Sequence, residues 1–377
     1  MKKNIIRITA LVMTMCLSLS FGAYAGTVNR SAEEWARLQD NTLEFDEIDG
    51  LINEYNATVK NNNYSLQDFK KNYGKTNDEI RNAYLDLADD LLGQTDYSDA
   101  TNTLMSINLE SQAKKAQANA DESLEDYEQY RLTYESAEKA LAQSAKLKMI
   151  AYYNAVLAAE KAALTAELAA SDLNVLNVKR SVGMATSAEI LTAQETALNA
   201  QQTIATAQST IETTKKKLQV LCGWKYESDA EIAGLPAPDL ARVIDPAADL
   251  QTAIDNNYTL KINERKLSYA QAGSTKDSLD VTINSNKQNI AMSLNNLAAN
   301  IDAAKKAYNY AAVNAQLMEK TLNNVRAKKS AGTASAVELS AQEKQTRIAQ
   351  IALQEAANAV LEAYVAYDYA LAGLASA

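Results

Sequence analysis

The stretch RSVGMATSAEILTAQE at residues 180–195 decides the fold, because the chain repeats it as KSAGTASAVELSAQE at residues 329–343. The glycines of the two copies, Gly183 and Gly332, are 149 residues apart, as are the glutamates that follow them, Glu189 and Glu338. Glycine readily takes the left-handed backbone that ends many helices. Each copy therefore predicts a tight reversal of the chain between two helices.

Apolar residues continue at seven-residue intervals downstream of both glycines. The first series is Ile190, Ala197, Ile204, Ile211 and Leu218, and the second is Leu339, Thr346, Leu353, Val360 and Tyr367. A seven-residue beat is typical of the seam between packed, coiled-coil-like helices. The pattern predicts a mainly all-α fold of long antiparallel helices in two tandem repeats.

Glycine and proline are too scarce for an ordinary globular chain. The three prolines all fall in one stretch, at Pro236, Pro238 and Pro246. No glycine or proline interrupts residues 94–182, 184–222, 274–331 or 333–372. The longest of these runs would span at most about 130 Å as one unbroken helix.

Residues around each glycine match the ends of helices. The candidate N-caps are Thr186 or Ser187 in the first copy and Thr333 or Ser335 in the second. Glu189 and Glu338 lie at the start of the outgoing helix, where the helix dipole favours an acid. Arg180 and Lys329 lie in the last turn of the incoming helix, where it favours a base.

Residues 1–25 read as a secretory signal peptide. Lys2, Lys3 and Arg7 precede an apolar run, and Ala23-Tyr24-Ala25 supplies a small-x-small cleavage site. The alternative is an uncleaved anchor. Cleavage would change the formal net charge from -10 to -13, since it removes three basic residues and no acidic one. An acidic exported chain does not favour nucleic acid as a partner.

The composition excludes several kinds of catalytic and metal site. The chain has no histidine, so it cannot form a Ser-His-Asp or Cys-His nucleophile site or the usual zinc ligand sets. The mature chain would keep only Cys222, which rules out an intramolecular disulfide. We therefore expect no enzyme activity, no metal site and no cofactor.

The two halves begin in a similar way. Ser31 with Glu34 has the spacing of a capping box, and each half opens with a short helix and a break that contains asparagine, at residues 31–43 and 250–260. We predict a first repeat over residues 26–227, a Pro-rich linker over 228–248 and a second repeat over 249–377.

These features together resemble the TolC family of outer-membrane efflux proteins. Members carry two repeats, each with a Gly-x-x-Ser-x-x-Asp/Glu-hydrophobic-Leu-x-Ala-Gln segment and a long helix that ends in Leu-x-x-Leu-x-Gly. The first copy supplies Gly183, Ser187 one place late, Glu189, Ile190, Leu191, Ala193 and Gln194, then Leu218, Leu221 and Gly223. The second supplies Gly332, Ser335, Glu338 and Leu339, then Leu371 and Gly373. The resemblance covers nearly all of the mature chain.

The resemblance implies a homotrimeric helical tube that serves as the exit duct of a multi-part export system. A periplasmic adaptor (membrane fusion) protein would link its tip to an inner-membrane pump. The implied location is the cell envelope, and the outer membrane if the host has one. The implied tip and docking residues are Arg180, Val182, Gly183, Ser187, Lys329, Gly332 and Ser335. Glu189 and Glu338 are candidates for an acidic gate, although a second family acidic position falls near Ala341.

One departure concerns the β-barrel strands that family members insert in each repeat. In the second half only Leu279, Val281 and Ile283 alternate with polar residues, and residues 56–100 of the first half read as polar helices broken at Gly74 and Gly93. We expect the barrel strands to be absent or vestigial. The alternative function is therefore a secreted or cell-envelope helical scaffold or adhesin that keeps the fold without channel activity.

Overall fold

The computed structural model describes residues 30–377, so the signal-peptide prediction lies outside the described residues. The long helices are α6 (Tyr127–Ser181), α7 (Ser187–Leu221), α10 (Ser274–Ser330) and α11 (Ala336–Tyr369). The shorter elements are α1 (Ala32–Gln39), β1 (Thr42–Leu43), α2 (Ile48–Tyr55), α3 (Ala57–Tyr73), α4 (Asn77–Leu92), α5 (Ala100–Glu122), β2 (Glu231–Ile232), α8 (Pro246–Asn256), α9 (Tyr258–Tyr269) and the π-helical turn η1 (Ala370–Leu374). The prediction of a mainly α-helical fold is confirmed.

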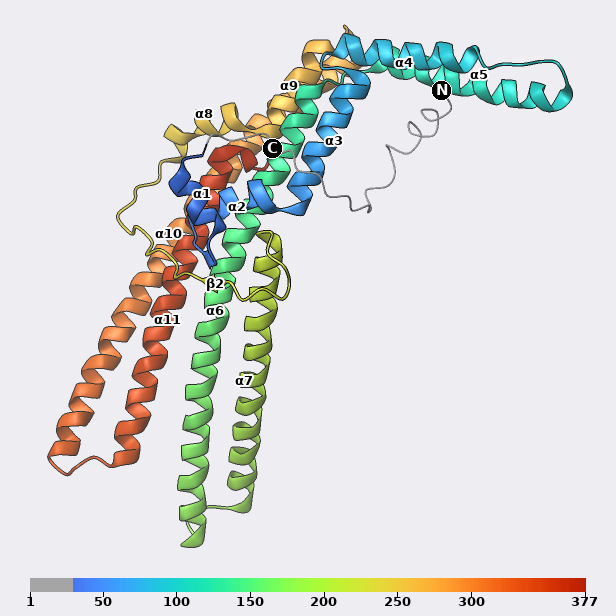
Figure 1. The fold of residues 1–377 in the computed structure, drawn as a ribbon. Helices are drawn as coiled ribbons and strands as arrows, with labels where there is room; N and C mark the ends of the chain where they lie inside the picture. Colours follow the sequence, from blue (N-terminus) through green and yellow to red (C-terminus); the bar gives the residue numbers. More distant parts are fainter. Residues whose placement is uncertain (1–29) are drawn as a thin grey trace.

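The four long helices form one layer, in the order α7, α6, α11, α10 (Figure 1). Helix α6 packs against α7 on one side and α11 on the other, and α11 packs in turn against α10. With 55 and 57 residues, α6 and α10 are each about 80 Å long. The layer therefore ends in two outer helices, α7 and α10, which pack against a long helix on one side only.

The runs without glycine or proline predicted α7, α10 and α11 closely. The run that contains α6 was predicted with one error. Residues 94–182 do not form one helix, because the chain leaves α5 at Ser123 and starts α6 after Asp126. The Asp126 carboxylate caps α6 by accepting a hydrogen bond from the Gln129 N–H at 2.8 Å. A cap of this kind starts a new helix without glycine or proline.

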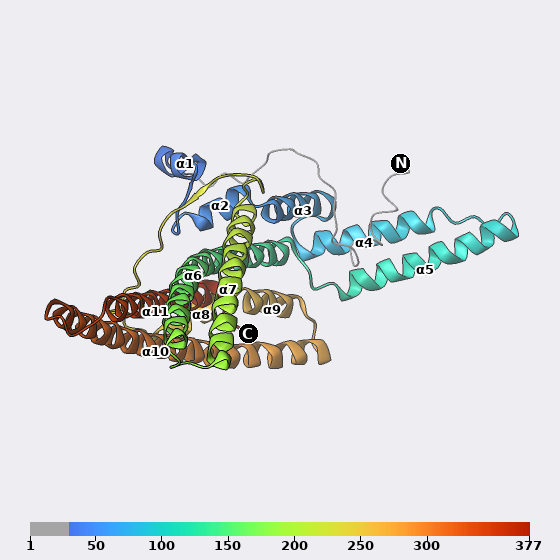
Figure 2. The same ribbon diagram turned by 90° about the horizontal axis from the view of Figure 1, so that it is seen from below.

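Helices α4 and α5 pack against each other as an antiparallel pair that leaves the layer sideways (Figure 2). We call residues Asn77–Glu122 the side hairpin. The breaks predicted at Gly74 and Gly93 are found at the ends of α3 and α4. In the second half, residues Ala270–Gly273 alone connect α9 to α10. The two halves therefore differ mainly in this insertion.

The strands found in residues 30–377 have two residues each. They pair in parallel, with Thr42 opposite Glu231 and Leu43 opposite Ile232. Residues 279–283, which alternate weakly in sequence, lie inside α10. None of the helices in residues 30–377 combines the length and the hydropathy of a membrane-spanning segment.

Two clusters of buried apolar side chains hold the layer together, and α11 contributes to both. The first joins α2, α6, the end of α7 and the end of α11, with Ile52, Ile150 and Leu218 at most 1% exposed. The second joins α8, α9, the upper part of α10 and α11, with Ile290 and Tyr367 fully buried. Burying each such side chain contributes about 1.5–3 kcal/mol.

One buried asparagine in each half ties the start of a helix to the end of that half. The Asn56 Oδ1 accepts from the Thr58 and Val59 N–H groups, and its Nδ2 donates to the Leu221 carbonyl at 2.7 Å. Asn257 caps α9 through the Leu260 N–H, and its Nδ2 donates to the Ala375 carbonyl at 2.8 Å. The break that matches Asn257 is therefore Asn56, not the earlier Asn41.

Replacing either buried asparagine with alanine should destabilise the protein by about 2–3 kcal/mol, because each change removes a helix cap and leaves a buried carbonyl without its donor. Thermal unfolding followed by circular dichroism measures this. Asn61→Ala, at an exposed position of α3, is the control and should change stability by less than about 0.5 kcal/mol. Equal melting temperatures for Asn56→Ala, Asn257→Ala and the control would contradict the assignment.

Candidate functional site

The two predicted reversals lie at the same end of the molecule, away from the side hairpin (Figure 1). Gly183 and Gly332 have φ angles of 77° and 74°. A Cβ at either position would meet no atom within 4 Å, so the glycine requirement comes from the backbone angle and not from crowding.

Each reversal ends its incoming helix with the same backbone hydrogen bonds. In the α6–α7 turn, the Gly183 N–H donates to the Arg180 carbonyl at 3.0 Å and the Met184 N–H to the Lys179 carbonyl at 2.8 Å. In the α10–α11 turn, the Gly332 N–H donates to the Lys329 carbonyl at 3.0 Å. This pairing satisfies carbonyl groups that a helix end otherwise leaves free.

The two outgoing helices are capped differently. Thr186, rather than Ser187, caps α7 in a capping box, where the Glu189 carboxylate accepts from the Thr186 N–H at 2.6 Å. That hydrogen bond, with a second from the Thr186 hydroxyl, lowers the pKa of Glu189 below its usual value. In the other turn, Ser335 caps α11 by accepting from the Glu338 N–H at 3.0 Å.

This difference separates the two candidate gate residues. The Glu189 carboxylate is held in its own cap, whereas no described residue donates to the Glu338 carboxylate, which is exposed. Glu338 therefore remains the better candidate for contact with another molecule.

The surface of both turns is basic, and that of the α6–α7 turn is also apolar. Lys179 and Arg180 end α6, and Lys328 and Lys329 end α10, all of them exposed. Val182 and Met184, 66% and 74% exposed, add apolar contact area to the α6–α7 turn. Exposed apolar and basic side chains of this kind suit a protein partner better than a small molecule.

A groove of about 490 Å³ runs between α6 and α7 just above their turn. Its lining is made mostly of small and polar side chains, among them Ala169, Asp172, Ala188, Thr192, Ala193 and Thr196. Small side chains let a neighbouring helix approach closely.

Replacing Gly183 or Gly332 with valine should destabilise the protein by about 1–2 kcal/mol, because a β-branched residue is strained at positive φ. Melting temperatures measure the effect. Gly234→Val is a matched control, since a Cβ there also meets no atom within 4 Å and its φ is not positive. Unchanged melting temperatures for both turn variants would refute this account.

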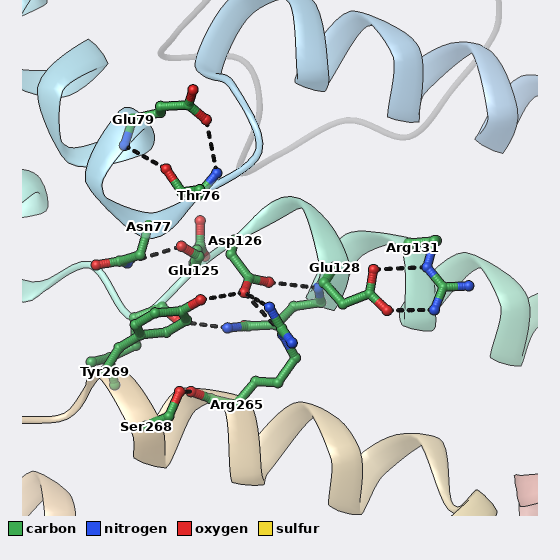
Figure 3. A network of polar contacts seen from close by, with 12 residues as sticks. Thr76, Asn77, Glu79, Glu125, Asp126, Glu128, Arg131, Arg265, Ser268 and Tyr269 are labelled. Atoms are coloured by element: carbon green, nitrogen blue, oxygen red, sulfur yellow. Dashed lines mark hydrogen bonds and ion pairs between the residues drawn. The ribbon is translucent and has the colours of Figure 1, made fainter.

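The structure also brings together a polar network that the sequence did not reveal, at the base of the side hairpin (Figure 3). The side chain of Asp126 is fully buried and accepts from Arg265 Nε at 2.9 Å and from the Tyr269 hydroxyl at 2.6 Å. Both partners lie on α9, so Asp126 connects the first half of the chain to the second. Its partners are at least 139 residues away in sequence, which is why no local pattern indicates them.

The same network fixes the side hairpin. Asn77, at the start of α4, donates to the Ser123 and Glu125 carbonyls at 3.0 and 2.9 Å (Figure 3). Thr76 and Glu79 form a capping box that starts α4. The two ends of the hairpin are therefore held together where it leaves the layer.

Burial alone would raise the pKa of Asp126, but the hydrogen bonds from Arg265, Tyr269 and the Gln129 N–H outweigh it and lower that pKa. A carboxyl group whose pKa is lower in the folded state stabilises the fold above its unfolded pKa, near 3.9. That stabilisation is lost as the pH falls through the lower, folded value.

Asp126→Asn should cost about 1.5–3 kcal/mol at pH 7, because asparagine keeps the cap but leaves Arg265 without its counter-charge. The difference from wild type should shrink as the pH falls from the unfolded pKa, near 3.9, through the lower, folded pKa. Urea unfolding at pH 7 and over a series of acidic pH values measures both effects. The control Asp302→Asn breaks an exposed i,i+4 ion pair with Lys306 and should cost less than about 0.5 kcal/mol. A pH-independent loss would contradict the role of the charge.

The described residues 30–377 offer neither a metal-binding cluster nor a reactive thiol. No group of three or more Cys, Asp or Glu side chains there is arranged to hold a metal ion. Burial raises the pKa of the Cys222 thiol to about 12, which leaves it protonated and unreactive at neutral pH.

No protein-family model matches the sequence, and neither does any curated protein. Solved structures do match. A membrane protein from Pseudomonas aeruginosa is 14% identical, with a TM-score of 0.57, and the match covers 87% of this chain and 90% of that one. The CmeC outer membrane channel of Campylobacter jejuni is 10% identical, with a TM-score of 0.57 and coverage of 96% and 94%. The open MtrE outer membrane channel of Neisseria gonorrhoeae is 13% identical, with a TM-score of 0.51 and coverage of 87% and 89%.

At these identities the likeness concerns the fold, and it extends over almost the whole described chain. The likeness agrees with two features described above, the paired helix reversals and the single layer of long helices. The chain has the fold of the TolC-family outer-membrane efflux channels.

Proposed function

We propose that the chain is one subunit of an export duct, a homotrimer whose long helices close into a tube. The observation that carries this proposal is the open layer, since α7 and α10 each pack against one long helix and leave the other side free. A layer with two free edges can gain a neighbour at both of them when copies associate in a ring.

Both free edges carry exposed apolar side chains at heptad spacing. On α7 these are Leu191, Leu198 and Ala205, seven residues apart. On α10 they include Tyr310, Val313 and Leu317, which are 78%, 66% and 54% exposed. Helices that are apolar on more than one side need more than one neighbour. The α10 edge of one copy therefore offers a natural partner for the α7 edge of the next.

The number of copies comes from the resemblance, which implies three subunits and twelve long helices around the tube. In such a ring the six reversals gather at one end. Lys179, Arg180, Lys328 and Lys329 would then form a basic rim, with Val182 and Met184 among them. A periplasmic adaptor protein would dock on this rim and in the groove between α6 and α7, and would link the duct to an inner-membrane pump.

The proposed roles of the turn residues follow from their positions. Gly183 and Gly332 hold the reversals, and Ser335 caps α11. Arg180, Val182, Ser187 and Lys329 are exposed and available to a partner. Glu338 would point its carboxylate at the pore entrance or the adaptor.

The location and the class of protein complete the proposal. The chain would be exported by its signal peptide to the cell envelope, and to the outer membrane in a host that has one, as the outer membrane channels of similar fold suggest. It would act as a passive conduit and not as an enzyme.

Residues 26–227 and 249–377 would be tandem repeats joined by the linker 228–248. The matching reversals and buried asparagines support this. So does a second pair of glycines with positive φ, Gly223 and Gly373, where a Cβ would collide with the backbone of Tyr55 and Asn256 respectively.

Leu198→Glu on one edge and Val313→Glu on the other should each weaken assembly by about 2–4 kcal/mol, because each buries a charge in the apolar seam. Sedimentation velocity of the mature chain over a range of concentrations, with and without detergent, measures the association. Asn61→Glu is a control at an exposed position of α3, outside both edge helices, and should have no effect. A wild-type chain that stays monomeric throughout would leave the scaffold alternative in place of the duct.

A further inference from the structure

The side hairpin concentrates the negative charge of the chain. Residues Asn77–Glu122 hold ten Asp and Glu and three Lys and Arg, a net charge of −7 in a protein whose formal charge is −10. None of the ion pairs found among residues 30–377 includes a carboxylate of this segment. The hairpin is therefore an acidic projection whose three basic residues form no ion pair with its carboxylates.

The far half of the hairpin also exposes large apolar side chains. Leu104, Met105 and Ile107 of α5 are 71%, 61% and 54% exposed. Helices α4 and α5 pack mainly against each other. At the base, α4 also packs against α3, and Arg81, Asp121 and Glu122 line a cleft with residues 269–275 of the same copy. Apolar side chains grouped beside acidic ones are typical of a binding surface.

The direction of the hairpin indicates what it can reach. In two perpendicular views it extends away from the α10–α11 turn, on the α7 side of the layer (Figures 1 and 2). In a ring closed by the α7 and α10 edges, the copy on that side presents its α10. The start of α10 and its connection to α9 lie at the same end of the molecule as the hairpin (Figure 1).

That part of the neighbouring copy is weakly basic, since residues 258–287 hold five Lys and Arg and three Asp and Glu, a net charge of +2. Lys261 and Lys266 on α9 and Lys276 on α10 take part in none of the ion pairs found among the described residues, and Lys276 is exposed. Val281, two turns into α10, is 70% exposed. The three lysines complement the unpaired carboxylates of the hairpin, and Val281, which lies beside the exposed Asp277 and Asp280, adds apolar contact area.

We infer that the side hairpin is an assembly arm, which lies against the α9–α10 connection of the adjacent copy in the ring. This inference rests on the proposed duct and adds a second, charge-complementary contact to the apolar seam. The partner that we propose for the hairpin is a second copy of this chain. An anionic lipid surface is a poorer fit, because ten unpaired carboxylates would be repelled by it.

A charge-swap cycle on the full mature chain tests the arm. One variant is Asp86→Lys/Asp89→Lys/Asp90→Lys, at three exposed positions of α4. The other is Lys261→Glu/Lys266→Glu/Lys276→Glu. Each alone should weaken association about tenfold at low ionic strength, and less at high salt. Together they should restore the wild-type dissociation constant within about threefold.

The matched control is Asp68→Lys/Glu227→Lys/Asp229→Lys, which makes the same change in net charge at exposed positions outside the hairpin. Its dissociation constant should stay within about threefold of wild type. Circular dichroism establishes that each variant is folded. A second variant, with residues 77–122 replaced by a short flexible linker, should assemble more weakly than wild type.

The outcomes separate the arm from the duct. A wild-type chain that never associates contradicts both. Wild-type assembly that is unchanged by the charge reversals and by removal of the hairpin contradicts the arm alone. Binding of the wild-type chain, but not of the hairpin-deleted chain, to phosphatidylcholine vesicles, with assembly unchanged, would assign the hairpin to lipid and overturn the inference.

Discussion

The left-handed backbone at Gly183 and Gly332 is the constraint on which the rest of the structure depends. It turns each pair of long helices back on itself, so that α6 lies along α7 and α10 along α11. Only then can α11 pack against α6 and join the two pairs in one layer. The buried clusters, the free edges and the basic turns all follow from that arrangement. The conformation of these two glycines thus determines how the four long helices pack.

The sequence predicted the features that depend on neighbours along the chain. The glycine reversals, the uninterrupted runs that became α7, α10 and α11, and the polar helices broken at Gly74 and Gly93 each have a local cause. The break at Ser123–Asp126 was missed because it contains neither glycine nor proline. The signal that could have shown it is Asp126 three residues before Gln129, which is the spacing of an N-cap.

The contacts between the halves could not be predicted, because they depend on residues far apart in the chain. Asp126 meets Arg265 and Tyr269 in the other half of the chain, and Asn257 meets a carbonyl 118 residues away. The separation of Glu189 from Glu338 also needed the structure. Their spacing from the glycines is the same, yet only the threonine cap engages its glutamate in return. Similar sequence at the two turns therefore does not give them the same chemistry.

The edges presented by α7 and α10 are different surfaces, so any contact between them is heterologous. Such a contact does not by itself limit the number of subunits, since each added copy offers the same free edge as the one before it. Whether the series closes after three copies depends on the angle between the α6–α7 and α10–α11 pairs, which the packing of α6 on α11 sets. A substitution in that internal seam could therefore change the number of subunits, or open the ring into a filament, without altering either edge.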